Sequence, residues 1–168
     1  NGYIPFIAIQ VKAIKVGDNI SLFFTKVLDE VRLDLLEEDN QSEPTDRNYW
    51  EKKVGKPQMK FLDNLYANLS EVIGEFNLKY NKHYIGIEQN NIANNFIYFH
   101  PNKKAVIFNI RLDKSDEYDE KFENSDLDML SYDKQWRVYR IRLKENDFIN
   151  NLDLLKEMAL IAKKERLG

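Results

Sequence analysis

Residues 79–112 read KYNKHYIGIEQNNIANNFIYFHPNKKAVIFNIRL, and the rest of the chain is interpreted around this stretch. Its C-terminal part, residues 105–112, alternates strictly between two sets of side chains. The sets are Val106, Phe108, Ile110 and Leu112 on one side, and Ala105, Ile107, Asn109 and Arg111 on the other. A period of two predicts a strand that buries one face and turns the other face outward.

Two more strands are expected in the same stretch. Residues 95–100 are aromatic and β-branched, which suits a pleated sheet, and residues 84–89 form the third candidate. The turn at residues 101–104 begins with a proline that fixes φ, and Asn90-Asn91 breaks the chain between the other two strands. Connections this short favour antiparallel neighbours, because a parallel pair needs a crossover of about a dozen residues or more.

Helices are expected on both sides of this stretch. Apolar residues recur every three or four positions in residues 57–76, which predicts a helix with one buried stripe. Residues 135–143 alternate like a fourth strand, and residues 151–166 carry a second helical stripe. These elements predict an α+β fold, with an antiparallel sheet of about four strands and two helices on one face. The opposite face is left for solvent or a partner.

The N-terminal residues predict a separate β-hairpin. Its strands are residues 3–16 and 19–28, and its turn is Gly17-Asp18-Asn19. Both faces of the hairpin are largely apolar, and an isolated two-stranded hairpin is marginal in water. We therefore expect it to pack against the rest of the chain, against an upstream domain, or against a second copy in a homodimer.

An acidic segment, residues 29–47, follows the hairpin. The polar cluster at residues 40–43 and Pro44 indicate a domain boundary. The predicted domains are residues 1–40, which hold the hairpin and its linker, and residues 45–168, which form the α+β domain.

The composition excludes several classes of protein. The 168 residues include no Cys, which excludes disulfide bonds and cysteine-ligated zinc and is compatible with a reducing cytoplasm. No apolar run approaches the roughly 18 residues of a membrane span, and no signal peptide is visible, so we expect a cytoplasmic location. The chain begins with Asn1 rather than Met, which indicates a piece of a longer protein.

The net charge of −3 hides an uneven distribution. Two strand-rich segments are basic, and the connection between them, residues 113–133, begins with a strongly acidic run at residues 113–128. The basic residues are Lys79, Lys82, Lys103, Lys104 and Arg111, then Lys134, Arg137, Arg140, Arg142 and Lys144. The acids of the run are Asp113, Asp116, Glu117, Asp119, Glu120, Glu123, Asp126 and Asp128. A basic sheet with an acidic connection is therefore expected.

Three segments resemble one bacterial family: YNKHYIGI at 80–87, NNFIYFHPNKKAVIFNIRL at 94–112 and YDKQWRVYRIRL at 132–143. The family is a domain of unknown function at the C-terminus of chains labelled predicted transport proteins, behind a restriction-endonuclease-like domain. The resemblance covers residues 45–165. It implies that any nuclease activity lies upstream and that residues 1–40 are an appendage or the tail of that nuclease-like domain. Arg137 stands where the family has a small residue after the Trp.

No residue pattern indicates catalysis or a cofactor. His83 and His100 are the two histidines, and we expect both to be ordinary residues at strand ends. A nucleophile-elbow serine, a Gly-rich phosphate loop and the spacing of a calcium loop are all missing from the sequence. We therefore expect no catalytic, cofactor-binding or metal-binding residues, and no enzyme activity in this chain.

The outward face of the sheet is the candidate for function. Arginines interleaved with aromatic rings suit single-stranded nucleic acid, whose phosphates take the charge and whose bases stack on rings. The expected binding residues are Lys82, Tyr84, Tyr98, His100, Arg111, Trp136, Arg140 and Arg142. The expected function is a non-catalytic accessory module that binds nucleic acid weakly or positions a nuclease-like domain. Three alternatives stay open: an outer face covered by the acidic run, packing against another domain, and a protein-interaction or dimerisation module without nucleic-acid binding.

Overall fold

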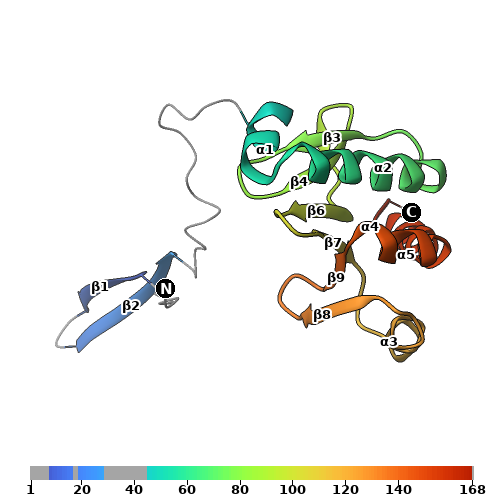
Figure 1. The fold of residues 1–168 in the computed structure, drawn as a ribbon. Coiled ribbons are helices and arrows are strands. Elements are labelled where there is room, and N and C mark those ends of the chain that lie inside the picture. The colour runs from blue at the N-terminus through green and yellow to red at the C-terminus, as the bar shows by residue number, and fades with distance from the viewer. Residues whose placement is uncertain (1–7, 17–18, 29–44, 168) are drawn as a thin grey trace. The chain divides into compact units, whose positions relative to one another are not determined.

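The computed structural model describes residues 8–16, 19–28 and 45–167, whose fold is drawn in Figure 1. The chain divides into two compact units, residues 1–42 and 43–168. Each unit is described by itself.

The N-terminal unit contains two antiparallel strands, β1 (Ala8–Val16) and β2 (Asn19–Leu28), which form a sheet of their own. The predicted hairpin is confirmed over these residues. Its expected turn at residues 17–18, its first residues 3–7 and the expected linker at residues 29–44 lie outside the described part of the chain.

The C-terminal unit is built on a seven-stranded sheet whose described neighbours all pair antiparallel. The order is β3-β4-β6-β7-β9-β8, and β5 pairs with β4 outside this path. The strands are β3 (Asn77–Tyr80), β4 (Ile85–Gln89), β5 (Ile92–Ala93), β6 (Ile97–Pro101), β7 (Val106–Arg111), β8 (Asp128–Asp133) and β9 (Val138–Leu143). The predicted α+β class with an antiparallel sheet is confirmed. The expected number of strands, about four, was wrong, because β3, β5 and β8 are additional.

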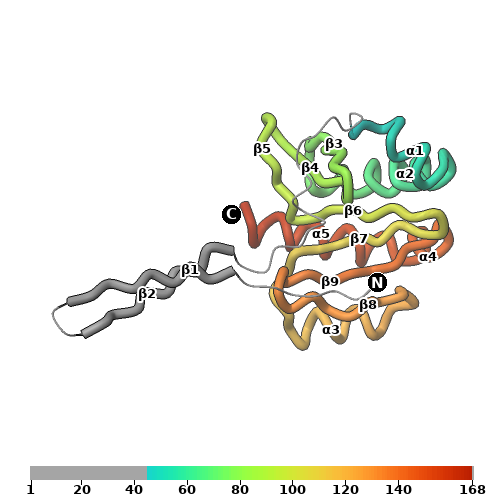
Figure 2. The backbone as a smooth tube through the Cα atoms, turned by 90° about the vertical axis from the view of Figure 1, so that its left-hand side faces the viewer, coloured from blue at the N-terminus to red at the C-terminus, as the bar shows by residue number. Residues whose placement is uncertain are grey.

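The described residues form five helices rather than the two that the sequence predicts. They are α1 (Arg47–Val54), α2 (Lys56–Ile73), α3 (Asp116–Glu123), α4 (Glu145–Asn150) and α5 (Leu152–Leu167). Figure 2 shows the two long helices, α2 and α5, behind the strands, and they contact each other as well as β6 and β7. The sheet therefore has an inner face, covered by these helices, and an outer face on the opposite side.

The core lies between the two long helices and the inner face of the sheet. Phe99 and Phe108 are paired across β6 and β7, and their rings stack with centres 5.4 Å apart. Tyr66 of α2 meets Phe99 edge-on, with ring centres 6.3 Å apart. Burial raises the pKa of Tyr66 to about 12, because the charged phenolate would lose its water. The residues that alternation assigns to the inner side of β7 are all fully buried: Val106, Phe108, Ile110 and Leu112.

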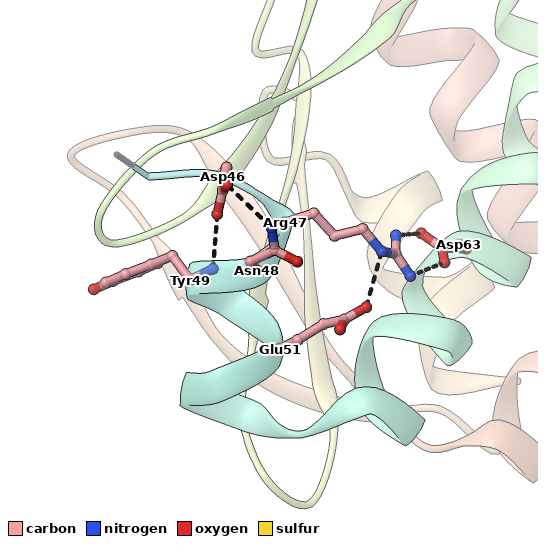
Figure 3. A network of polar contacts seen from close by, with 6 residues as sticks. All are labelled: Asp46, Arg47, Asn48, Tyr49, Glu51 and Asp63. Atoms are coloured by element: carbon pink, nitrogen blue, oxygen red, sulfur yellow. Dashed lines mark hydrogen bonds and ion pairs between the residues drawn. The ribbon is translucent and has the colours of Figure 1, made fainter. Parts of the chain in front are cut away.

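Helix α1 is held on α2 by a polar network (Figure 3). Asp46 caps the helix, because its Oδ1 accepts the N–H of Tyr49 at 2.8 Å. Arg47 donates to both carboxylate oxygens of Asp63 on α2, at 2.7 and 2.6 Å, and its Nε donates to Glu51 at 3.0 Å. The hydrogen bonds to Asp63 raise the pKa of Arg47. The network fixes α1 relative to the rest of the helical layer.

Candidate nucleic-acid interface

The outer face carries the side chains that alternate with the buried inner residues. Strand register arranges them in rows across β6, β7 and β9. One row is Tyr98, Asn109 and Arg140, and the next is His100, Ile107 and Arg142. Figure 2 views the sheet from this side, with α2 and α5 behind it. Three adjacent strands therefore contribute predicted site residues to one surface.

Three aromatic side chains meet at the β4–β6 side of this surface. Tyr84 lies directly before β4, and its ring centre is 5.6 Å from that of Tyr98 and 6.1 Å from that of His100. Tyr98 and His100 are two residues apart on β6, with ring centres 5.4 Å apart. All three side chains are half-buried. Tyr84, Tyr98 and His100 are called the ring cluster below.

Asn109 lies between the ring cluster and β9. Its side chain is 1% exposed although it points away from the helices. Its Nδ2 donates to the backbone carbonyls of Ile107 at 3.0 Å and Tyr98 at 3.3 Å, and lies 3.1 Å from Nδ1 of His100. These three contacts hold the Asn109 amide beside the His100 ring.

Two arginines of the outer face, Arg111 and Arg140, have no carboxylate partner among residues 45–167. Arg111 pairs with Val138 across β7 and β9, so Arg140 is its diagonal neighbour at about 7–8 Å between Cα atoms. Cζ of Arg111 lies 5.7 Å from the centre of the Tyr98 ring. Nε of Arg111 is buried and has no hydrogen-bond partner in the described part of the chain. Two neighbouring cations without an acid between them favour the approach of an anion.

Other charges on this face are paired. Arg142 donates to Asp128 of β8 at 2.9 Å, and these two residues lie opposite each other in the β8–β9 register. Lys79 of β3 lies 3.3 Å from a carboxylate oxygen of Glu88 on β4. The positive charge that no neighbouring acid balances on this part of the sheet therefore belongs to the two arginines described above.

The part of the acidic run that forms α3 packs against Tyr139 of the inner face, whereas Asp128 pairs with Arg142, so the alternative in which the run balances the outer face holds at one arginine. Part of the run forms α3, and Phe122 of this helix packs against Tyr139 of the inner face, with ring centres 5.0 Å apart. Asp119 accepts a hydrogen bond from Oη of the same tyrosine at 2.9 Å. Asp128 is the acid of this run that bonds an arginine of the predicted site. The two unpaired arginines form no ion pair with an acid of the run among the residues described.

Two predicted residues lie in turns at opposite ends of the sheet. Lys82 is in the β3–β4 turn, where its carbonyl accepts a hydrogen bond from Nζ of Lys53 on α1 at 2.9 Å. Trp136 is in the β8–β9 turn and is 39% exposed, and its N–H donates to Asp133 at 3.1 Å. The turn with Lys82 leads into β4, and the turn with Trp136 leads into β9. Because β4 and β9 run in opposite directions, the two turns lie at opposite ends of the sheet. The structure therefore does not bring Lys82 and Trp136 together.

Asn95 supports the ring cluster, and the sequence analysis missed this role. Its Oδ1 accepts the N–H of Ile87 at 3.2 Å, and its Nδ2 donates to Oη of Tyr84 at 3.3 Å. The Asn95 side chain thus crosses Gly86, where an added Cβ would overlap Oδ1 of Asn95. A glycine inside a strand often marks a place where another group approaches the backbone closely. Gly86 is therefore the sequence signal that could have predicted a contact such as the one with Asn95.

Other kinds of site find no support in the residues described. Within them, no group of three or more His, Asp or Glu side chains could hold a metal ion. None of the helices described is both long and apolar enough to cross a membrane. No protein-family model, curated protein or solved structure matches the chain. The family resemblance stated above therefore stays an expectation.

Proposed function

We propose that the outer face of the sheet binds single-stranded nucleic acid and that this chain is a non-catalytic accessory module. The observation that carries the proposal is the pair of unneutralised arginines, Arg111 and Arg140, beside the ring cluster. The family resemblance supports the accessory role, with any nuclease activity in an upstream domain.

The arginines supply the electrostatic part of the binding. A guanidinium group offers a planar set of donors that matches a phosphate and stays charged at any physiological pH. Two neighbouring like charges without an acid between them repel each other, and the repulsion is stronger beside a protein surface than in bulk water. A polyanion replaces this repulsion by attraction, so it is the kind of ligand that stabilises the pair.

The ring cluster supplies a second, uncharged contribution. Each base stacked on an aromatic side chain contributes about 1–3 kcal/mol, whatever its identity. The cluster therefore favours bases that are not already paired and stacked inside a duplex. The chain's net charge of −3 opposes binding of any polyanion. We expect a dissociation constant of about 10⁻⁶–10⁻⁴ M, typical of non-specific contacts.

The test is fluorescence anisotropy with a labelled oligothymidylate at about 50 mM salt. Binding by the parent is expected, together with a loss of about tenfold or more in the variant Arg111→Gln/Arg140→Gln/Arg142→Gln. Glutamine removes the charge and keeps most of the aliphatic stem, so packing on the sheet is preserved. Absence of binding by the parent at this salt concentration contradicts the proposal.

A matched control separates the outer face from overall charge. Lys52, Lys60 and Lys164 are exposed on α1, α2 and α5, and they have no ion pair among the described residues. Changing all three to Gln alters the net charge as much as the arginine variant does. The control variant is expected to retain most of the parent's affinity, and an equal loss in both variants contradicts a site on the outer face.

A second function, self-association through the N-terminal hairpin, is favoured by a different observation. β1 and β2 form a sheet with no third strand in the described residues, and such a pair is marginal in isolation. Light scattering on the full chain and on a chain lacking residues 1–40 tests this. We expect a dimer for the full chain and a folded monomer for the truncated one. A monomeric full chain at all concentrations contradicts it.

A further inference from the structure

We infer that the outer face orients its strand, with bases over the ring cluster on the β4–β6 side and phosphates along the arginines on the β7–β9 side. This inference rests on the proposed function and adds to it which chemical group of the ligand each side of the face takes. It also implies a site that takes about three nucleotides of single strand and binds duplex more weakly.

Arg140 and Arg142 are separated from the ring cluster across the sheet, whereas the guanidinium of Arg111 lies over the Tyr98 ring. Tyr98 on β6 and Arg140 on β9 belong to one row, with Asn109 of β7 between them. Two strand spacings, about 10 Å, therefore separate the backbones that carry the ring and the guanidinium. Asn109, which lies between them, is short and buried, so it contributes almost no exposed surface of its own. A nucleotide that lies across this row presents its base to one side and its phosphate to the other.

The same arrangement repeats one step along the strands. His100 follows Tyr98 by two residues on β6, and Arg142 follows Arg140 by two residues on β9. The register joins His100 to Arg142 through Ile107. Both steps cover about 7 Å, because a strand rises about 3.3–3.4 Å per residue. Two ring-and-guanidinium rows in register thus fit two consecutive nucleotides of an extended strand.

Arg111 extends the row of cations by one position. It is the diagonal neighbour of Arg140, on the side away from Arg142, and its guanidinium lies over the Tyr98 ring. The three arginines therefore mark contacts to about three consecutive phosphates. Duplex ligands hold their bases stacked inside the helix, so they can use the arginines but not the ring cluster.

The first experiment is photochemical cross-linking to an oligonucleotide that contains 5-bromodeoxyuridine, followed by tryptic digestion and mass spectrometry. The expected adduct is on the peptide of residues 83–103, which carries all three rings of the cluster. Adducts on the peptide of residues 135–137, which contains Trp136, or on helical peptides overturn the inferred orientation.

The second experiment compares oligothymidylates of two to twelve nucleotides, an abasic phosphodiester and a duplex, by anisotropy. Affinity is expected to rise steeply up to about three nucleotides and slowly thereafter. Tyr98→Leu is expected to weaken oligothymidylate binding about tenfold and to leave abasic binding unchanged, whereas Arg140→Gln weakens both. Equal effects of Tyr98→Leu on both ligands overturn the inference but leave the proposed function standing. Failure of every oligonucleotide to bind overturns both.

Discussion

Nη1 of Arg142 lies 2.9 Å from Oδ2 of Asp128, and the two residues face each other across β9 and β8. About half of each side chain remains exposed, at 44% and 46%, so the ion pair is a surface interaction that stabilises the fold little. The ion pair matters more for function, because it engages the guanidinium of Arg142, which lies at one end of the row formed by Arg111, Arg140 and Arg142.

Asp128→Asn is therefore expected to tighten nucleic-acid binding about 1.4- to fivefold, which corresponds to the roughly 0.2–1 kcal/mol of an exposed ion pair. Asp113→Asn is the matched control, because Asp113 pairs with Arg137 in a turn and its replacement changes the net charge equally. Anisotropy titrations of both variants decide the point. Equal tightening in both variants means that overall charge, and not release of Arg142, is responsible.

Gly86→Ala is expected to destabilise the protein by about 1–3 kcal/mol. The new Cβ displaces Oδ1 of Asn95, which leaves the buried N–H of Ile87 without its acceptor. In a chain that already carries Asn95→Ala, the same replacement is expected to cost much less, because the obstacle and the hydrogen bond are both gone. Urea denaturation of the two single variants and the double variant measures this coupling. Additive losses contradict the described contact.

Phe108→Ala is expected to cost about 3–5 kcal/mol of unfolding free energy, the usual range for a fully buried phenylalanine. Ile107→Ala, one residue away on the outer face and half-buried, serves as the control and should cost clearly less. A loss below about 1 kcal/mol for Phe108→Ala in denaturant melts would show that the faces of β7 are assigned backwards.

Asp119 is expected to make stability depend on pH on the acid side. Its hydrogen bonds, first from Lys114 and then from Tyr139, hold its pKa below the ordinary value of 3.8. A lowered folded-state pKa contributes stability that is present above pH 3.8 and is lost as the pH falls below it. Between about pH 6 and about pH 3, Asp119→Asn should therefore lose less stability than the parent. Denaturant melts at both pH values test this, and parallel losses contradict it.

The centre of the sheet could be predicted from the sequence, because β7 and β9 alternate strictly and both faces of that alternation are observed. Its edges could not. β8 begins at Asp128, the last acid of the acidic run, and ends at Asp133. These charges did not resemble a strand pattern, although an edge strand tolerates them. The expected helix ran through residue 76, but α2 ends at Ile73 because Gly74 adopts φ 83° as its C-cap, and β3 begins shortly after.

The candidate site depends on register, which alternation alone does not supply. Alternation put Arg140 on an outward face but left the face of Tyr98 open, and their common row follows from the pairing of three strands. Asp128 was missed as a partner of the site because its strand was missed. Arg137 adopts φ 54°, in the left-handed region, at the position where the resembled family has a small residue.

The central claim is that arginines of the outer face contact phosphates, and the most direct measurement is the salt dependence of binding. Three phosphate contacts to a single strand give a slope of about −2 in a plot of log affinity against log salt, at about −0.7 per contact. Anisotropy titrations from about 50 to 200 mM salt supply the slope for the parent, and for the variant Arg111→Gln/Arg140→Gln/Arg142→Gln. We predict a slope near −2 for the parent and a nearly flat line for the variant. A parent that does not bind at the lowest salt, or a variant that keeps the parent's slope, would contradict the claim.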